Sequence, residues 1–534
     1  MKKSQSFTLR LFSLLLAILL PLLTLASCSA EAPNNDQMGG VNYSTNENYT
    51  PSDPSVKPEA GEADEEIFTD MDGMIEPSAP VGPNEIFKEN RFVKVSDSPI
   101  STFSSDVDTA SYAYFRKLVN SGYSFSALTQ DFGYSIRTEE MLNYFTYHYT
   151  EPKEGELFGI HTEIAPCPWN TDNYLMMINF TAKTVEANPN GNNLVFLIDV
   201  SGSMYSSDKL PLLKTAFTYL VERLTEKDRI SIVTYSGKEE VVLEGCPGNE
   251  KETILRAINS LSANGSTNGQ AGIQRAYEIA ESCRIEGGNN RILMASDGDL
   301  NVGISSVDAL TAFISEKRDS GIYLSVLGFG TGNYQDEKME ALADNGDGVY
   351  YYIDGEHEAE RIFGEALFST LYTVAEDVKL QITFAENAID SYRLIGYENR
   401  MLNTEDFNDD KKDAGEIGSG HTLTVCYELV PTSIADNEEA PSAFLTLAVR
   451  YKNPGESVSI LREYTYGRES LAETPSEELR FAAAIIETAM LLHRSQYLGS
   501  VTLESVIGYL REINFTDDKK AEFKALLEKA YQRE

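Results

Sequence analysis

The chain has 534 residues, of which 42% are hydrophobic and 24% are charged, and its formal net charge is −39 at pH 7. This length and composition predict a globular protein with room for two to four domains, and they exclude a largely disordered chain. The excess of acidic residues excludes binding to nucleic acid or to an anionic bilayer through the net field of the protein.

Residues 1–28 are predicted to be a bacterial lipoprotein signal peptide. Three basic residues precede an apolar stretch at positions 11–25, which is too short and too early to indicate a permanent membrane span. The stretch ends in Leu25-Ala26-Ser27-Cys28, which is similar to a lipobox, so we expect cleavage before Cys28 and acylation of that residue. The protein is then extracytoplasmic and anchored to the cell membrane by lipid. The alternative is an ordinary secretory signal with an incidental cysteine.

Residues 29–92 are predicted to form a disordered acidic tether. They are rich in Asn, Pro, Glu, Asp and Ser, and they include the run Glu62-Ala-Asp-Glu-Glu66. Few apolar side chains and repelling like charges leave nothing from which to build a packed core. We expect this segment to hold the folded part of the chain away from the membrane surface.

Residues 93–189 are predicted to form an N-terminal α+β region, with two strands within 157–185. The sequence Asp106-Val-Asp108-Thr-Ala110 resembles the D-x-D-x-T/V motif of phosphatases that form an aspartyl intermediate, but Ala110 stands where Thr or Val is required. No long apolar strand precedes this sequence. We therefore expect these residues to cap a helix that starts near Thr109.

Residues 190–374 alternate between apolar strand-like runs and amphipathic helix-like stretches. Such alternation predicts an α/β domain with a doubly wound, mostly parallel sheet that is covered by helices on both faces. The short run 239–243 is the expected exception, as an antiparallel edge strand. The predicted strands are 193–199, 229–235, 239–243, 291–296, 322–329 and 349–353, and the predicted helices are 209–224, 250–262, 270–284, 306–318, 335–343 and 356–373.

Residues 375–470 are predicted to be β-rich, and residues 471–534 to be a C-terminal helical region. Strand-like alternation on both sides of the α/β domain predicts one sandwich-like region, formed by 375–470 together with 157–187, into which the α/β domain is inserted. A fold that places these two segments in separate cores would refute this hypothesis. The strands expected after the α/β domain are 378–384, 392–395, 422–427, 443–449 and 457–461.

The cysteines do not indicate a disulfide framework. If Cys28 is acylated, Cys167, Cys246, Cys283 and Cys426 remain, and none of them forms a CxxC pair. We expect Cys283 and Cys426 to be packed thiols, and a single disulfide among the four stays open.

A second candidate metal loop is a weaker match. Asp406-Phe-Asn408-Asp-Asp410 fits part of an EF-hand loop, but Lys411 stands where Gly is required and Ile417 where Glu is required. A charged hairpin loop is the preferred interpretation.

The main candidate site follows the apolar run 193–198, which ends in Asp199-Val-Ser201-Gly-Ser203. Such a run is typical of a buried parallel strand, so the carboxylate and the two hydroxyls are expected at its carboxyl end, where open α/β sheets bind ligands. Two further loops follow, Gly265-Ser-Thr267-Asn268 and Ser296-Asp297-Gly298. Together they offer hard oxygen ligands from three separated stretches of chain, which is the chemistry that Mg²⁺ prefers. Because hydroxyls are neutral, a cation held this way stays electrophilic and favours an anionic ligand from outside.

This combination resembles the metal-ion-dependent adhesion site of von Willebrand factor type A domains. The resemblance implies that Asp199, Ser201, Ser203 and Thr267 are metal ligands and that Asp297 binds directly or through water. It also implies that Mg²⁺ is the cofactor, with Mn²⁺ or Ca²⁺ as alternatives, and that a partner protein completes the shell with an exposed Asp or Glu.

A wider resemblance covers about residues 95–512. It is to bacterial von Willebrand A lipoproteins, which are often labelled homologues of calcium-activated chloride channels. The residues that carry it include 101–112, 137–145, 295–303 and 392–417. The channel label does not by itself imply conduction.

These observations predict a surface-anchored, metal-dependent protein-interaction module of the adhesion type, and not an enzyme. One alternative is a structural or transporter-associated envelope protein whose metal site is vestigial or purely stabilising. The other is a hydrolase, which needs a base beside Ser201 or Ser203. None of the five histidines lies in the loops that supply the site.

Overall fold

The computed structural model describes most of the chain from residue 88 onward. The contact pattern divides the protein into residues 1–71 and 72–534, and every described residue belongs to the second unit. The predicted signal peptide, Cys28 and most of the predicted tether lie outside the described residues. The structure describes residues 88–147, 149–185, 190–266, 269–298, 307–330, 336–366, 371–432 and 443–534.

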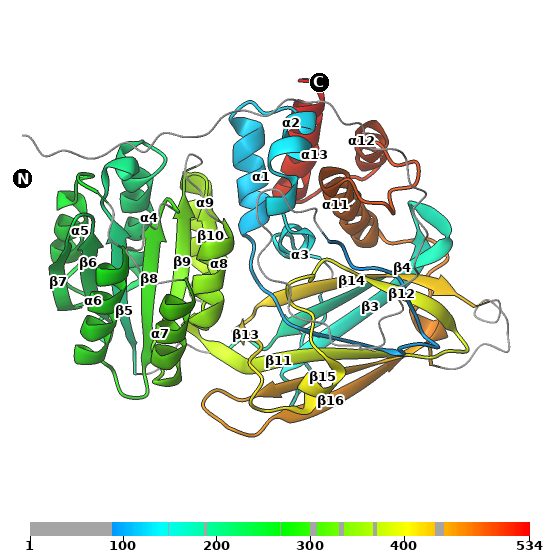
Figure 1. Ribbon diagram of the computed structural model, residues 1–534, viewed down its shortest axis with the longest axis horizontal. Coiled ribbons are helices and arrows are strands. Elements are labelled where there is room, and N and C mark those ends of the chain that lie inside the picture. Colours follow the sequence, from blue (N-terminus) through cyan, green and yellow to red (C-terminus); the bar gives the residue numbers. More distant parts are fainter. Residues whose placement is uncertain are drawn as a thin grey trace, which may run out of the picture. The chain divides into compact units, whose positions relative to one another are not determined.

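A six-stranded sheet forms the centre of the predicted α/β domain (Figure 1). Its strand order is β10-β9-β8-β5-β6-β7, and all neighbours are parallel except β7, which pairs antiparallel with β6 at one edge. The doubly wound sheet and its antiparallel edge strand, both predicted from the sequence, are therefore confirmed. The strands are β5 (Asn192–Asp199), β6 (Arg229–Tyr235), β7 (Glu239–Pro247), β8 (Asn289–Ser296), β9 (Tyr323–Phe329) and β10 (Tyr350–Ile353).

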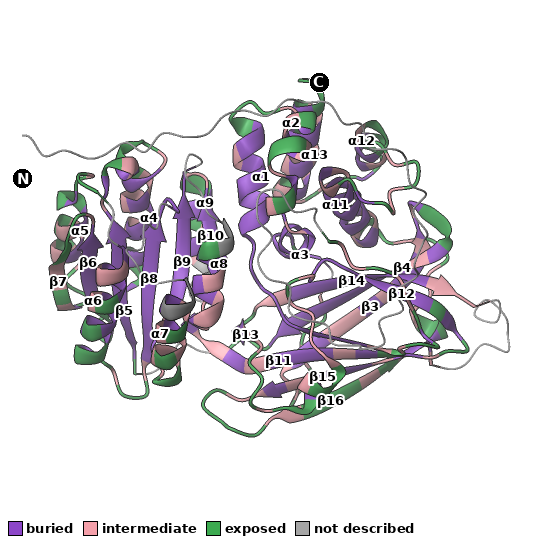
Figure 2. Ribbon diagram, viewed as in Figure 1, coloured by how far each residue is buried: buried purple, intermediate pink, exposed green. Residues whose placement is uncertain are grey.

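Helices cover both faces of this sheet. They are α4 (Leu210–Arg223), α5 (Lys251–Ser260), α6 (Gly269–Ser282), α7 (Val307–Asp319), α8 (Asp336–Asn345) and α9 (Glu356–Arg361). Successive side chains of β5 point to opposite faces. Val195 and Leu197 join the core on the α6 side, whereas Phe196 joins the core on the α4 side. The strands are largely buried except the edge strand β7, and the outer helix surfaces are exposed, as Figure 2 shows.

Two further sheets contain the strands that lie before and after the α/β domain in the sequence. One has the order β1-β12-β14-β4-β3; in the other β11 pairs with β2, β13 and β15, and β15 pairs with β16. Strand β4 pairs with β14, with Met177 opposite Cys426, and β2 pairs with β11, with Phe103 opposite Leu380. The predicted insertion of the α/β domain into a β-rich region is therefore confirmed. The strands are β1 (Val93–Lys94), β2 (Ile100–Ser104), β3 (Phe158–Cys167), β4 (Asn170–Ala182), β11 (Thr373–Phe384), β12 (Ile389–Ile395), β13 (Gly415–Gly418), β14 (Thr422–Pro431), β15 (Leu445–Lys452) and β16 (Ile460–Tyr466).

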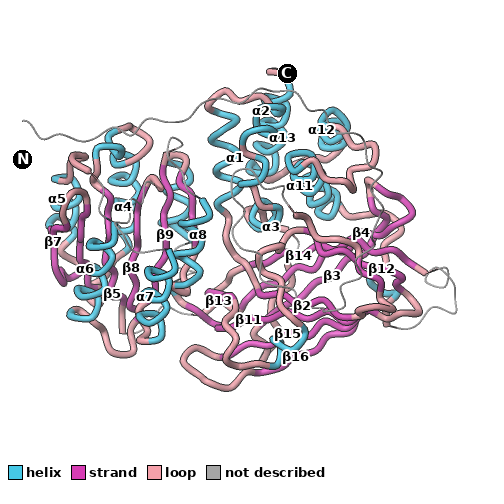
Figure 3. Tube along the Cα trace, in the orientation of Figure 1, coloured by secondary structure: helices cyan, strands magenta, loops and turns pink. Residues whose placement is uncertain are grey.

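Helices from both ends of the described chain pack together (Figure 3). Their rings form one aromatic cluster, in which the ring centroid of Phe145 lies 4.9 Å from that of Phe481 and 5.9 Å from that of Phe523. Among the helices that the structure describes, none combines the length and the apolar character needed to cross a membrane. The helices of this group are α1 (Ala110–Asn120), α2 (Phe125–Asp131), α3 (Thr138–Asn143), α11 (Glu477–His493), α12 (Leu503–Arg511) and α13 (Asp518–Tyr531).

The predicted boundaries of one helix and one strand were wrong. The helix predicted at 356–373 is α9 followed by a π-helical turn over Ile362–Ala366, and the β-branched pair Thr373-Val374 already belongs to β11. The strand predicted at 457–461 is β16, which starts at Ile460 and continues to Tyr466 because it pairs with β15 as far as Leu445.

The predicted tether also ends earlier than expected. Glu89 Oε1 accepts a hydrogen bond from Ser495 at 2.9 Å, and the Phe92 ring packs against Tyr497 with centroids 5.4 Å apart. Residues 88–92 are therefore part of the folded unit.

The prediction that Cys283 and Cys426 are packed thiols is confirmed. Cys167, Cys246, Cys283 and Cys426 are all free and buried. Burial raises the pKa of the Cys426 thiol well above its ordinary value, so this thiol stays protonated inside the sheet.

Candidate metal centre

Asp199 lies at the carboxyl end of the central strand of the α/β sheet. All eight residues of β5 are buried, and Asp199 itself is 0% exposed. Parallel neighbours on both sides, β6 and β8, enclose the strand. The apolar run therefore places a fully buried carboxylate at the edge of the sheet where such folds bind ligands.

The turn after β5 gathers the two predicted serine ligands. The Ser201 amide donates to Asp199 Oδ1 at 2.8 Å, and the hydroxyl oxygens of Ser201 and Ser203 lie 2.9 Å apart. The Gly202 amide donates to the carbonyl of Gly265 at 3.0 Å, which brings the second predicted loop alongside the first. The fourth predicted ligand, Thr267, lies outside the described residues.

Asp297 follows β8, the parallel neighbour of β5. Because Ile198 is opposite Ala295 in the register, Asp199 and Asp297 belong to adjacent strand ends. Asp297 is 1% exposed. The chain then turns at Gly298, whose φ of +88° is a conformation that glycine adopts without strain.

A cation of the protein itself touches this site, and sequence reasoning missed it. Lys209 Nζ donates to Asp297 Oδ2 at 2.7 Å, and the Lys209 side chain is only 11% exposed. The sequence pattern predicts Lys209 only as the first residue of the helix 209–224. The available signal was a lysine six residues beyond Ser203, at the position before helix α4. Its spacing alone does not identify Asp297 as its partner.

The electrostatics of the site favour a cation. Burial, followed by the charges of Asp199 and Asp297, raises the pKa of Tyr235 well above its ordinary value, so its phenol stays neutral beside them. Two buried carboxylates, those of Asp199 and Asp297, lie at adjacent strand ends, and the ammonium of Lys209 pairs with Asp297. Burial of carboxylates is favoured where cations lie close to them. Neutral hydroxyls and carboxylates are the oxygen donors that Mg²⁺ prefers, so the donor set fits a hard divalent cation.

The serines show no arrangement for nucleophilic catalysis in the described residues. The Ser201 and Ser203 hydroxyls bond to one another, and no described histidine hydrogen-bonds to either of them. His421 and His493 are engaged elsewhere in the chain, where burial lowers the pKa of each to about 4.

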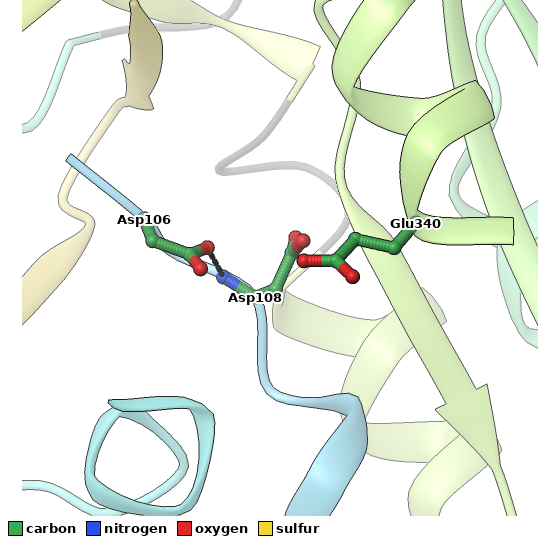
Figure 4. Close-up of side chains that lie close together, drawn as sticks. All are labelled: Asp106, Asp108 and Glu340. Carbon is green, nitrogen blue, oxygen red and sulfur yellow. Dashed lines mark hydrogen bonds between the residues drawn. The ribbon is translucent and has the colours of Figure 1, made fainter. Parts of the chain in front are cut away.

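A second acidic cluster, shown in Figure 4, lies where the N-terminal segment meets helix α8. The Asp108 amide donates to Asp106 Oδ1 at 3.0 Å, and Asp108 and Glu340 present their carboxylates to one another. Arg400 lies 3.2 Å from Asp106, 3.7 Å from Asp108 and 3.6 Å from Glu340, and Arg137 pairs with Glu340. Since two guanidinium groups already pair with these carboxylates, the cluster is an ion-pair network that links the N-terminal segment to helix α8.

The predicted helix cap at Asp106–Thr109 was wrong. Thr109 precedes α1 without a capping side-chain hydrogen bond, and the amide of Ser111 donates instead to Glu140 Oε2 at 2.7 Å. Asp108 Oδ1 accepts a hydrogen bond from the Tyr350 amide at 2.9 Å, so this carboxylate caps the edge of β10. The aspartyl-phosphatase interpretation gains no support from these contacts.

A third acidic group contains residues of the EF-hand-like segment. Asp347, Asp413 and Glu416 lie close together, and Arg318 pairs with Asp347 at 3.4 Å and also with Asp413. Burial and the charge of Asp413 raise the pKa of Asp347 to about 8, which means that this carboxylate holds a proton at neutral pH. The segment ends in strand β13 and not in a free loop.

Three family models match the chain. The model described as von Willebrand factor type A domain matches residues 193–365, the one described as von Willebrand factor matches 84–177, and the one described as uncharacterized protein YfbK, C-terminal, matches 369–532. The first match covers the six-stranded sheet with Asp199 and Asp297. Domains of this type typically mediate protein interactions.

A relative that is similar over most of the chain supports this assignment. Uncharacterized protein YfbK of Escherichia coli K12 is 38% identical over 468 residues, which cover 83% of this chain and 80% of that protein. Human inter-alpha-trypsin inhibitor heavy chain H3 is 27% identical over 258 residues, which cover 44% of this chain and 28% of that protein. A von Willebrand factor type A structure from Catenulispora acidiphila has a TM-score of 0.40 at 16% identity and covers 69% of this chain and 88% of its own. The chain belongs to the YfbK family of proteins that contain a von Willebrand factor type A domain.

Proposed function

We propose that the protein is a metal-dependent interaction module of the bacterial cell envelope. In this proposal Asp199, Ser201, Ser203 and Thr267 hold Mg²⁺, with Mn²⁺ or Ca²⁺ as alternatives, and Asp297 binds the cation directly or through water. An exposed Asp or Glu of a partner protein completes the coordination. The interaction is not enzymatic.

One observation carries the proposal: two buried carboxylates and two touching hydroxyls converge at adjacent strand ends. Asp199 is 0% exposed and Asp297 is 1% exposed, and the Ser201 and Ser203 oxygens lie 2.9 Å apart. Burying carboxylates this deeply costs free energy unless a cation compensates them. Lys209 pairs with Asp297, and a divalent cation at the same strand ends would stabilise both carboxylates further.

In this arrangement the bound cation would keep part of its positive charge uncompensated by the protein. Neutral serine ligands leave it electrophilic, and Mg²⁺ demands near-octahedral oxygen coordination. The chain's own residues hold and orient the cation, and an external carboxylate is the ligand that suits the remaining position.

The location of the protein is part of the proposal. The lipobox-like Leu25-Ala26-Ser27-Cys28 supports acylation at Cys28, and the acidic stretch that follows supports a tether between membrane and domain. The family relationship supports an interaction module in which the sandwich-like region carries the von Willebrand A domain.

Affinity capture tests this function. The tagged full chain is incubated with detergent-solubilised bacterial envelopes in Mg²⁺ or in EDTA, as the wild type and as Asp199→Ala. We expect partners that are retained by the wild type only in Mg²⁺ and that Asp199→Ala does not retain. Asp208→Ala is the matched control, because Asp208 belongs to the same loop but bonds to Ser206 and Lys117.

Circular dichroism of both variants confirms that they are folded. Capture of the same proteins in EDTA, or by Asp199→Ala, would contradict a metal-dependent mechanism.

A further inference from the structure

We infer that Lys209 is a built-in counter-cation of the metal centre. Its ammonium makes the site one charge more positive, which weakens binding of the divalent cation and strengthens binding of the external carboxylate. This inference rests on the proposed function, since it concerns the same cation and the same ligand.

The ammonium is held in place by more than its ion pair. Lys209 Nζ lies 2.7 Å from Asp297 Oδ2, and the side chain is 11% exposed. Its aliphatic stem lies against Gly330, where an added Cβ would stand 2.3 Å from Cε, 3.0 Å from Cγ and 3.1 Å from Cδ of the lysine. The Tyr352 hydroxyl donates to the Gly330 carbonyl at 2.6 Å and fixes the backbone that supports the stem. A lysine packed in this way behaves as a fixed charge.

The order of the strands leaves room for the ammonium and the proposed cation on different sides of Asp297 in our inference. Asp297 follows β8, which lies between β5 and β9 in the sheet. Asp199 ends β5 and the two serines follow it, whereas Gly330, which supports the Lys209 stem, follows β9. In our inference the lysine therefore stays on the β9 side of Asp297 when a cation binds on the β5 side.

The charges of these groups determine whether Lys209 strengthens or weakens the binding of the metal ion and of the carboxylate. Asp199 and Asp297 contribute two negative charges, Lys209 one positive charge and the divalent cation two. The loaded centre carries a net charge of +1 with the lysine and of zero without it. A partner carboxylate is attracted to a centre with net positive charge, whereas a second positive charge nearby repels the incoming metal ion.

A two-step titration separates this role from a merely structural one. Free Mn²⁺ is measured by electron paramagnetic resonance as it is added to the full chain, and acetate is then added to the Mn²⁺-loaded protein while water-proton relaxation reports displacement of metal-bound water. For Lys209→Met we expect Mn²⁺ to bind about tenfold more tightly and acetate about tenfold more weakly. A loss of structure would weaken both, so the opposite signs identify the charge effect.

Two further variants complete the experiment. Gly330→Ala keeps the lysine but forces its stem away from Asp297, and it should shift both constants in the same directions as Lys209→Met; it also tests the inference if Lys209→Met does not fold. Lys317→Met, on helix α7, removes the same charge from an ion pair with Glu281 of helix α6 and should change neither constant.

The outcomes are distinct. If the wild type binds Mn²⁺ and Lys209→Met binds it equally or more weakly, the counter-cation role is overturned and the proposed function stands. If neither protein binds Mn²⁺, the proposed function fails, and the inference fails with it.

Discussion

Arg116 on helix α1 places its Nη2 2.7 Å from Glu358 Oε2 on helix α9, although 242 residues separate them in the sequence. The same guanidinium pairs with Asp354 at 2.6 Å. The Arg116 and Glu358 side chains are 6% and 1% exposed. Helix α1 is thus joined to helix α9 of the von Willebrand A domain by a buried ion pair.

Arg116→Met should lower the free energy of unfolding by about 3–5 kcal/mol, because it removes the cation that pairs with buried Asp354 and one of the two cations that pair with Glu358, the other being Arg361. Urea denaturation followed by circular dichroism measures the change. Arg275→Met is the matched control: it breaks a pair with Glu278 whose side chains are 40% and 62% exposed, so it should cost about 0–1 kcal/mol. Equal effects of the two substitutions would show that burial of the Arg116 pair is unimportant.

Glu487, on helix α11, gives a pH-dependent prediction. Burial raises the pKa of this carboxyl from 4.5 to about 7, so the folded state binds its proton more tightly than the unfolded state. The associated stability is present at pH 4.5 and is lost as pH rises through about 7, a difference of about 3 kcal/mol. Glu487→Gln cannot ionise and should match the wild type near pH 4.5 and exceed its stability above pH 7. A stability difference that does not change between pH 4.5 and 8 would refute the assignment.

The aromatic pair beneath the metal centre predicts a large packing effect. Phe196 of β5 and Phe217 of α4 are both 0% exposed, and their rings are stacked with centroids 4.2 Å apart. Phe217→Ala should cost about 3–5 kcal/mol, because it removes a buried ring and leaves a cavity. Tyr205→Ala truncates a side chain that is 82% exposed, and it should change stability by less than about 0.5 kcal/mol in the same denaturation assay. A cost below about 1 kcal/mol for Phe217→Ala would mean that the site collapses around the missing ring.

Much of the α/β domain was predictable from the sequence, because its signals are local. The run 193–198 is apolar throughout, and such a run followed by polar residues indicates a buried strand that ends at a ligand-binding edge. The same logic placed Asp199 and Asp297 at the carboxyl ends of two buried strands. That these strands are neighbours, with Ile198 opposite Ala295, is seen only in the structure.

The missed features depend on contacts between distant parts of the chain. Strand β2 reads Ile-Ser-Thr-Phe-Ser, which has little strand signal until it pairs with β11. Asp108 accepts a hydrogen bond from the Tyr350 amide, which is 242 positions away in the sequence. Glu140 accepts one from the Ser111 amide, which is 29 positions away. Lys209 was missed for the same reason, because its partner Asp297 is 88 residues away. No periodicity or spacing rule reports such pairs.

The most direct test of the account is the position of a bound cation. Crystals of the protein soaked in Mn²⁺ would be examined for anomalous scattering at the manganese edge. The account predicts a peak within about 2.6 Å of oxygen atoms of Asp199, Ser201 and Ser203, at the carboxyl ends of β5 and β8. A peak at the Asp106, Asp108 and Glu340 cluster instead, or no peak beside Asp199 at saturating Mn²⁺, would contradict it.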